Sequence, residues 1–272
     1  MISDLLLEKY RILRKKNEPN IFATRNVRDL TVCELTDDLW LIIACDSDGG
    51  IGPKKNDTVY SPAYDVGRFG ARVPLMELLA SGAVPFIVVD TLCVEMNPTG
   101  KDIIQGVRDE AVYGGLTGNS IITGSTEDNV TTHQTGIGVT VIGVVHKNDF
   151  KPGSSKVKDA VVCIGIPKSA PEFKLTLNDN DIADSKLIKQ LSTIDYIHDI
   201  LPVGSKGIVH EFHELAASAG LVNHYSKNLS VDITKSGGPS TCCIVSLPKS
   251  HLNILERSIN KPISIIGELE NK

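Results

Sequence analysis

The sequence predicts an α+β fold in two domains of similar size, and three observations lead to this. Its 272 residues are enough for two modest domains that each bury a core. Helix-spaced and strand-like apolar segments alternate along both halves of the chain. The polar, turn-prone stretch at residues 147–155 lies near the middle and is typical of a linker. We therefore expect an N-terminal α/β domain over residues 1–149 and a C-terminal α+β domain over residues 150–272.

The individual elements follow from local spacing and from helix breakers. Basic residues near Lys16 favour the C-terminal end of a first helix, and Gly82 ends a second. Pro98 is tolerated in the first turn of a third helix. The expected helices cover residues 5–16, 65–81, 97–113, 181–200 and 207–219, with another after Pro248. The expected strands cover residues 32–35, 39–44, 83–90, 120–124, 135–145, 160–166, 229–233, 241–247 and 263–266.

Composition excludes several classes of protein. Hydrophobic residues make up 41% and charged residues 22% of the chain, which is ordinary for a soluble globular protein. A net charge of -5 gives no support for a nucleic-acid or anionic-membrane surface. The N-terminal residues do not resemble a secretory signal, and no apolar stretch reaches membrane-spanning length, so we expect a cytoplasmic protein. None of the six cysteines forms a Cys-x-x-Cys pair, which argues against a zinc or iron–sulfur site.

The most informative segment is residues 44–55, which read Ala-Cys-Asp-Ser-Asp-Gly-Gly-Ile-Gly-Pro-Lys-Lys. An apolar strand precedes it, so Asp46 and Asp48 are expected at a strand end, where ligands often bind. The glycines let backbone N–H groups approach an anion, and Lys54 or Lys55 could neutralise it. The spacing is neither a Walker A loop nor an EF-hand. A simple turn-forming Asp/Gly cluster is the alternative.

Several further segments, taken in order, resemble one superfamily. Residues 48–54 (Asp-Gly-Gly-Ile-Gly-Pro-Lys) are similar to the Asp-Gly-Val-Gly-Thr-Lys motif of aminoimidazole ribonucleotide synthetase, with one residue inserted. Residues 76–85 resemble its helix ending in Gly-Ala-x-Pro, and residues 86–91 its apolar strand ending in Asp. Residues 123–126 occupy the place of Gly-Gly-Asp/Glu-Thr, and residues 138–147 resemble the strand that closes the first domain. Thiamine-monophosphate kinase, selenophosphate synthetase and a hydrogenase maturation factor belong to the same superfamily.

The resemblance implies a synthetase-like fold that binds ATP and Mg²⁺ in the N-terminal domain and dimerises by pairing the sheets of that domain into a β-barrel. Asp46, Asp48 and Lys54 would be the catalytic set, with Lys54 next to the phosphates. The implied metal ligands are Asp46, Asp48, Glu77, Asp90, Glu127 and Asp128. The implied nucleotide-binding residues are Gly49, Gly50, Gly52, Lys54, Gly124 and Thr126. Ser125 stands where the family has an acid, so Glu127 or Asp128 must supply that charge, or one metal is held differently.

Sites in the second half are expected to hold the substrate. Residues 202–207 (Pro-Val-Gly-Ser-Lys-Gly) precede a helix, whose N-terminus can receive an anion through Gly204, Ser205 and Lys206. Ser236, Gly237 and Gly238 form a second flexible loop that could close over a nucleoside. His198 and Asp199, just before the first loop, are further candidates for substrate contact. Residues 210–214 (His-Glu-Phe-His-Glu) lack the His-Glu-x-x-His spacing and are expected on a solvated helix face.

Within the superfamily the chain looks most like the α-ribazole kinases of cobalamin salvage, through residues 28–31, 45–52, 202–207 and 236–240. The resemblance thus implies a homodimeric kinase that transfers the γ-phosphate of ATP to the 5′-hydroxyl of a nucleoside. Residues 26–30 (Asn-Val-Arg-Asp-Leu) replace the Gly-Asp-Asp-Ala of thiamine-monophosphate kinases and argue against that member. The alternatives are a synthetase-like ATP-dependent ligase, a thiamine-monophosphate-kinase-like enzyme, and a maturation or scaffold protein that keeps the ATP-binding fold.

Overall fold

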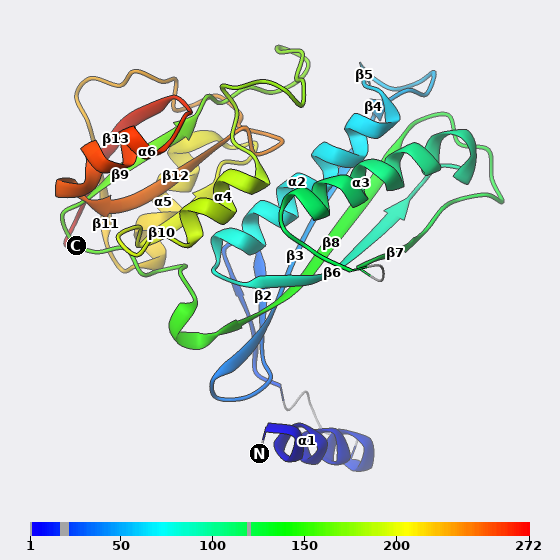
Figure 1. Cartoon of the computed structure of the whole chain (residues 1–272), viewed down its shortest axis with the longest axis horizontal. Helices are drawn as coiled ribbons and strands as arrows, with labels where there is room; N and C mark the ends of the chain where they lie inside the picture. Colours follow the sequence, from blue (N-terminus) through cyan, green and yellow to red (C-terminus); the bar gives the residue numbers. More distant parts are fainter. Residues whose placement is uncertain (1, 17–21, 119–120) are drawn as a thin grey trace.

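The computed structural model describes residues 2–16, 22–118 and 121–272. Within these ranges the chain contains two large sheets, each packed against helices, which confirms the predicted α+β class. Figure 1 shows the C-terminal sheet at one end of the molecule and the N-terminal sheet, crossed by α2 and α3, at the other. Helix α1 (Ile2–Lys16) lies apart from both sheets, and Lys9 on it donates a hydrogen bond of 3.1 Å to the carbonyl of Leu35.

The N-terminal sheet has six strands in the order β1-β2-β3-β8-β6-β7 across the described residues. Neighbouring strands are antiparallel except for β6 and β7, which run parallel. The strands are β1 (Thr24–Val27), β2 (Leu30–Glu34), β3 (Leu39–Gly49), β6 (Val84–Leu92), β7 (Ile122–Ser125) and β8 (Gly136–His146). Along β8 buried and half-buried residues alternate, because one face of the sheet lies under helices and the other does not.

Helices α2 (Ala63–Ala80) and α3 (Lys101–Tyr113) cover this face of the sheet, and a π-helical turn (Met96–Gly100) leads into α3. The two helices approach closely because glycine faces glycine where they cross. A Cβ on Gly67 would lie 2.0 Å from the carbonyl oxygen of Ile103, and one on Gly106 would lie 2.1 Å from that of Tyr64. Strands β4 (Ile51–Gly52) and β5 (Val59–Tyr60) form a small parallel pair beyond the end of β3.

The C-terminal sheet has five strands in the order β10-β12-β9-β13-β11, all antiparallel within the described residues. They are β9 (Asp159–Gly165), β10 (Asp199–Pro202), β11 (Val222–Tyr225), β12 (Cys242–Pro248) and β13 (Ile263–Glu270). Helix α5 (Gly207–Ser218) packs on one face through a core that includes Ile208, Phe212 and Ile244. The other face adjoins α4 (Ser185–Ser192) and α6 (Leu252–Ser258).

One hydrophobic core extends from the N-terminal sheet into the C-terminal half. Leu75 and Leu78 of α2 belong to the same buried cluster as Leu187 of α4 and Val245 of β12. Helix α2 is therefore shared by both halves, and its predominantly apolar sequence follows from burial on more than one side. The expected linker contains a short 3₁₀ turn (Lys147–Asp149). After it, Lys151 N–H donates a hydrogen bond of 3.0 Å to the carbonyl of Ser81, at the end of α2.

Three sequence-based expectations were wrong in detail. The helix expected over 181–200 ends at Ser192, and β10 follows because its backbone pairs with β12. The strand expected over 229–233 does not form; the edge strand is β11 (Val222–Tyr225), paired with β13. Strand β3 extends to Gly49 instead of ending at residue 44, since β8 supplies backbone partners whatever the side chains are. The expected strand at 120–124 starts partly outside the described residues, and β7 covers Ile122–Ser125.

None of the helices in the described parts of the chain is both long enough and apolar enough to span a membrane.

The glycine crossing of α2 and α3 can be tested by replacing Gly106 with alanine. The added methyl would meet the backbone of α2, so we expect the free energy of unfolding to fall by about 1–3 kcal/mol, the usual range for overpacking. Urea denaturation would measure this. Lys101→Ala, at an exposed position of the same helix, is the control and should change stability by less than about 0.5 kcal/mol. Equal stability of Gly106→Ala and wild type would show that the helices can separate freely.

Candidate active site

The site begins with a row of acids on the helix-covered face of the N-terminal sheet. Asp46 of β3 and Asp90 of β6 both pair with Val139 of β8, so all three side chains lie on one face. Asp48 pairs with the buried Ile137, and its Oδ2 would be 3.4 Å from a Cβ on Gly70 of α2. The two aspartates of β3 therefore lie within the strand and beneath a helix, which corrects the expectation that they follow the strand end.

Burial makes these carboxyl groups hard to ionise. It raises the pKa of Asp48 to about 6, with a smaller contribution from the charge of Asp46. It raises the pKa of Asp46 as well, and the nearby charge of Asp29 adds to this. Asp90 is only 2% exposed, and burial raises its pKa to about 6 against the opposing charge of Arg108. Its Oδ2 atom has no hydrogen-bond partner among the described residues, so it is poised to accept a cation or donor.

The row continues towards the C-terminal half through Glu77, Asp29 and Glu211. Burial raises the pKa of Glu77 to about 9, and the charges of Asp29, Asp46 and Glu211 add to the effect. The pKa of Glu211 on α5 is raised to about 7, again mainly by burial and then by Asp29. The Oε2 atom of Glu77 is buried and finds no hydrogen-bond partner in the described parts of the chain. Five carboxylates thus form an acidic line in which each is electrostatically coupled to another: Asp48, Asp46, Asp29, Glu77 and Glu211. Asp90 shares the sheet face of Asp46 but is not one of the five.

A small cavity of about 30 Å³ lies at the C-terminal end of this line. It is lined by Asp29, Glu77 and Glu211 together with Arg28 and Gly204, so both halves of the chain contribute. A space of this size admits a water molecule or an ion but no organic ligand. A larger ligand would therefore have to bind at the mouth of this cavity or widen it.

The acids fit Mg²⁺ by donor chemistry. Within the described residues, no group of three or more His, Cys, Asp or Glu side chains is arranged to hold a metal on its own. Mg²⁺ is usually held by one or two carboxylates together with water and phosphate oxygens, so a complete protein cage is not needed. The unpaired carboxylate oxygens of Glu77 and Asp90 are ligands of the kind that Mg²⁺ prefers.

The glycine-rich segment is held mainly by Asp57. Its carboxylate accepts hydrogen bonds from Lys54 N–H at 2.8 Å and from Thr135 N–H and Oγ1, each at 2.7 Å. Gly50 N–H donates to the carbonyl of Thr135 at 2.9 Å, so this N–H is not free for an anion. A Cβ on Gly52 would lie 2.3 Å from Thr135 Oγ1, whereas Gly49 has open space where its Cβ would be. Gly52 is thus required for packing, and Gly49 alone faces free volume.

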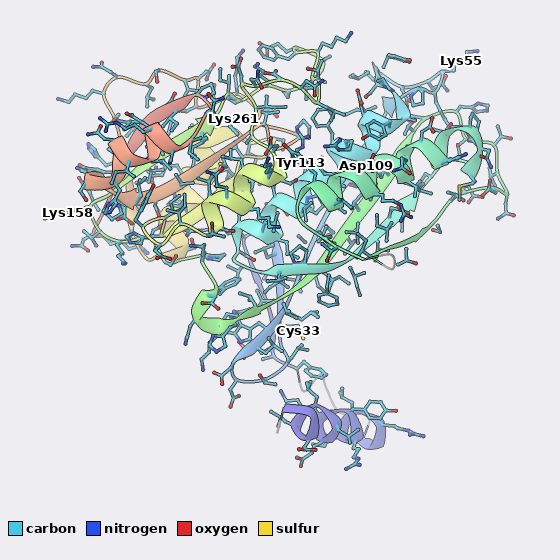
Figure 2. All side chains as sticks on the ribbon, in the orientation of Figure 1. Cys33, Lys55, Asp109, Tyr113, Lys158 and Lys261 are labelled. Atoms are coloured by element: carbon cyan, nitrogen blue, oxygen red, sulfur yellow. The ribbon has the colours of Figure 1, made fainter. Side chains whose placement is uncertain are left out.

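The two candidate lysines of this segment differ. Lys55 lies on the tip of the loop between β4 and β5 and points away from the molecule (Figure 2). The side chain of Lys54 is only 14% exposed and forms an ion pair with Glu95, a residue that no sequence motif marks. Lys54 also donates to the carbonyl of Thr132 at 3.0 Å. Lys54 is therefore the lysine with a defined position.

Strand β7 places Gly124 next to Asp90, and the carboxylates of the loop that follows are engaged in hydrogen bonds within that loop and to Met96. Gly124 pairs with Asp90 across the strands, and a Cβ on it would lie 2.0 Å from Asp90 Oδ1. Glu127 accepts hydrogen bonds from the N–H groups of residues 129 and 130, and Asp128 accepts from Met96 N–H and Thr126 Oγ1. In this arrangement the carboxylates of Glu127 and Asp128 hold the loop, so a metal would have to displace these bonds to use them.

The two loops proposed for substrate lie together. Gly237 N–H donates to the carbonyl of Gly204 at 3.0 Å, and Gly238 N–H donates to Ser236 Oγ at 3.2 Å. Gly204 also lines the cavity, while the side chains of Ser205 and Lys206 are exposed at the start of α5. The geometry thus brings Gly204, Ser205, Lys206, Ser236, Gly237 and Gly238 to one end of the acidic line.

His198 and Asp199 are engaged in contacts within the protein in this arrangement. Asp199 is fully buried, and Arg28 bonds to both of its carboxylate oxygens at 3.0 and 2.5 Å. Asp199 also accepts from the N–H groups of Gly153 and Ile200. His198 Nδ1 lies 2.7 Å from Asp159, at the opposite end of β10 from the Gly204 loop. Asp199 therefore ties the two halves together and has no carboxylate oxygen left for a substrate.

Sequence reasoning missed Asp29, Glu95 and Glu211. The signal for Glu211 was present, because Ile208, Phe212 and Leu215 define the buried face of α5 and Glu211 shares it. The expectation of a solvated helix face at residues 210–214 was therefore wrong for Glu211. Asp29 and Glu95 occur in short connections without periodicity, so no local pattern marks them.

Comparison with known proteins matches the N-terminal part of the chain to one family model. Residues 25–145 match the family model described as AIR synthase related protein, N-terminal domain. The match and the shared fold support the superfamily that the sequence resembles. No curated protein sequence matches the chain.

Solved structures with this fold cover nearly the whole chain. Thiamine-monophosphate kinase from Stenotrophomonas maltophilia is 17% identical with a TM-score of 0.61, covering 98% of this chain and 94% of its own. HypE, a hydrogenase maturation protein of E. coli, is 15% identical with a TM-score of 0.62, covering 85% and 80%. PurL of T. maritima, complexed with ATP, is 15% identical with a TM-score of 0.60, covering 98% of this chain but only 48% of its own. At these identities the likeness is one of fold.

The raised pKa values predict how the stability of the metal-free protein depends on pH. A carboxyl group with a raised folded-state pKa stabilises the fold fully below its unfolded pKa, and this is lost as pH rises through the folded value. For Glu77, whose pKa is about 9, the loss extends from about pH 4.5 to about pH 9. We therefore expect the free energy of unfolding to fall over this range in the presence of a chelator.

Glu77→Gln removes the ionisable group with the largest of these raised values, so its stability should fall less steeply with pH and exceed that of wild type at the alkaline end. Urea denaturation at a series of pH values would measure both curves. Asp102→Asn, on the exposed side of α3, is the matched control and should follow wild type. Parallel curves for Glu77→Gln and wild type would contradict a buried carboxyl group with a raised pKa at this position.

Proposed function

We propose that the protein is an ATP- and Mg²⁺-dependent kinase that transfers the γ-phosphate of ATP to the 5′-hydroxyl of α-ribazole, a step of cobalamin salvage. The observation that carries the proposal is the line of coupled carboxylates from Asp48 to Glu211, with an unpaired buried oxygen on Glu77. Such a line is destabilising unless cations neutralise it. Mg²⁺ bound to ATP would neutralise these carboxylates, close to the place proposed for the second substrate.

The residues divide into binding and charge-neutralising roles. Asp46, Asp48 and Glu77 would hold Mg²⁺ together with phosphate oxygens and water, with Asp90 alongside. Mg²⁺ would neutralise the phosphates and orient them for attack. Lys54 would donate to a phosphate oxygen and stabilise the charge that develops during transfer. Phosphoryl transfer of this kind depends on positioning and electrostatics, so a covalent nucleophile is not required.

The substrate would bind where the loops at residues 204–207 and 236–238 meet the acidic line. Their mutual hydrogen bond and the place of Gly204 at the cavity support this. The choice of α-ribazole rests on the sequence resemblance of the same two loops and of residues 28–31 and 45–52.

The proposal also includes a homodimer formed through the N-terminal sheet. It further places a domain boundary near residues 149 and 150 and the protein in the cytoplasm. The sheet face opposite α2 and α3 carries half-buried Leu41, Ile43, Ile142 and Val144 in adjacent strands. Phe86 on β6 is 42% exposed. An apolar face of this extent supports burial against a second copy.

A second candidate is phosphorylation of thiamine monophosphate, and the observation that favours it is the match of thiamine-monophosphate kinase over 98% of this chain.

A screen for ADP release decides between the two candidate functions: ATP and Mg²⁺ are combined in turn with α-ribazole, thiamine monophosphate and aminoimidazole ribonucleotide precursors. We expect ADP and phosphorylated product only with α-ribazole. ADP release only with thiamine monophosphate would select the second candidate, and release only with an amide precursor would select a ligase. Tight ATP binding without turnover, together with capture of a protein partner, would select a maturation or scaffold protein.

Asp48→Asn tests the metal site directly. The change removes a charge that would bind Mg²⁺ but keeps the size of the side chain, so kcat should fall by at least about a hundredfold. Since burial already disfavours the ionised form of Asp48, thermal stability without metal should stay equal or rise. Steady-state kinetics and thermal melting measure the two effects, with Asp102→Asn as the control. Full activity of Asp48→Asn would remove this residue from the metal site.

A further inference from the structure

The ammonium group of Lys54 is held from two directions. It forms an ion pair with Glu95 and donates to the carbonyl of Thr132 at 3.0 Å. The side chains of Lys54 and Glu95 are 14% and 29% exposed, so the pair is more sheltered than an ordinary surface ion pair. An ammonium has three N–H donors, and these contacts use two. Among the described residues no third acceptor bonds to Lys54, which leaves one donor for a ligand.

Glu95 is itself fixed. Its Oε1 accepts a hydrogen bond of 2.5 Å from Thr99 Oγ1, while Oε2 faces Lys54. Its carbonyl accepts from Gly100 N–H at 2.9 Å, and a Cβ on Gly100 would lie 2.8 Å from that oxygen. Burial alone would raise the pKa of Glu95, but the bonds from Lys54 and Thr99 outweigh it and lower the pKa to about 2. Glu95 is therefore a rigid anion at the start of the turn that leads into α3.

The backbone of Lys54 is fixed as well. Asp57 accepts its N–H at 2.8 Å and also binds Thr135, which in turn packs against Gly52. The lysine is thus held at both its backbone and its ammonium end, next to the segment that carries Asp46 and Asp48. A flexible side chain restrained in this way loses little further entropy when it binds an anion.

We propose that Glu95 is a positioning residue, which holds Lys54 with one N–H directed to a phosphate oxygen of the bound nucleotide. The inference rests on the proposed function. An ion pair between a lysine and a glutamate serves the same purpose in protein kinases, where it sets the lysine on the nucleotide phosphates. Here the pair joins the loop between β4 and β5 to the turn before α3. Lys54 and Glu95 are 41 positions apart in the chain.

Enzyme kinetics test the proposal through non-additivity. Glu95→Gln keeps the shape but removes the charge, and we expect kcat to fall at least about tenfold with the KM for ATP changed less than about threefold, as for an interaction used in the transition state. Lys54→Met should cause a similar or larger fall. The double variant should be no worse than Lys54→Met alone, because Glu95 acts through that lysine. Additive losses, or unchanged kcat in Glu95→Gln, would overturn the proposal.

A second measurement does not need turnover. An amine-reactive reagent is applied to the ligand-free protein, and modification of Lys54 is followed by mass spectrometry. Glu95→Gln should increase the labelling rate of Lys54 several-fold, while Asp102→Asn should not. ATP with Mg²⁺ should protect Lys54 in wild type. Unchanged labelling in Glu95→Gln, or no protection by ATP, would refute the role of Glu95. Absence of turnover with every substrate, with both labelling results intact, would instead refute only the proposed kinase activity.

If Glu95→Gln does not fold, as judged by circular dichroism, Thr99→Val takes its place. It removes only the hydroxyl that orients Glu95 and should give smaller changes in the same direction in kcat and in Lys54 labelling. Wild-type values of both in Thr99→Val would then overturn the proposal.

Discussion

The rest of the structure depends on helix α2, which is buried by the N-terminal sheet on one side and by the C-terminal half on the other. A buried ion pair fixes it there: Arg72 Nε lies 3.2 Å from Glu110 of α3, and Ser185 of α4 donates to the same carboxylate at 2.6 Å. Arg72 is 1% exposed and Glu110 is fully buried, so losing Glu110 would leave the charge of Arg72 unpaired inside the protein. Arg68 of α2 binds the same carboxylate at 2.8 Å and strengthens the link. Tyr113 of α3, labelled in Figure 2, donates a hydrogen bond of 3.2 Å to Asp184, the residue before Ser185.

A second link, between Arg28 and Asp199, sets the place where the two halves meet at the acidic line. Arg28 lies in the two-residue turn between β1 and β2 with a positive φ of 54°, and the next residue is Asp29. The ion pair therefore brings Asp29 to Glu77 of α2 and Glu211 of α5. Packing elsewhere in the fold must offset the cost of these crowded carboxylates. Such a cost is common where a site is organised for a charged ligand.

Much of the fold could be predicted from the sequence, because local patterns determine it. The helices at residues 63–80, 101–113 and 207–218, and the strands at 84–92, 136–146 and 242–248, follow periodicity and breakers closely. The candidate site was predictable in part: Asp46, Asp48 and Asp90 do lie on one face of the sheet, and the charge of Asp46 does act on Glu77. Glu127 and Asp128 show the limit, since a polar loop can use its carboxylates for its own N–H groups.

The sequence by itself determined the elements that arise from contacts a few residues apart: helix faces, strand alternation and the glycines of the segment after β3. Only the tertiary structure decided which acids meet. Arg28 and Asp199 are 171 positions apart, and Lys54 and Glu95 are 41 apart, so neither pairing leaves a trace in local spacing. The pKa values follow the same rule, because burial and neighbouring charge arise only after the halves have packed together. The same Asp/Gly segment could have been a solvated turn; its burial under α2 makes it part of the candidate site.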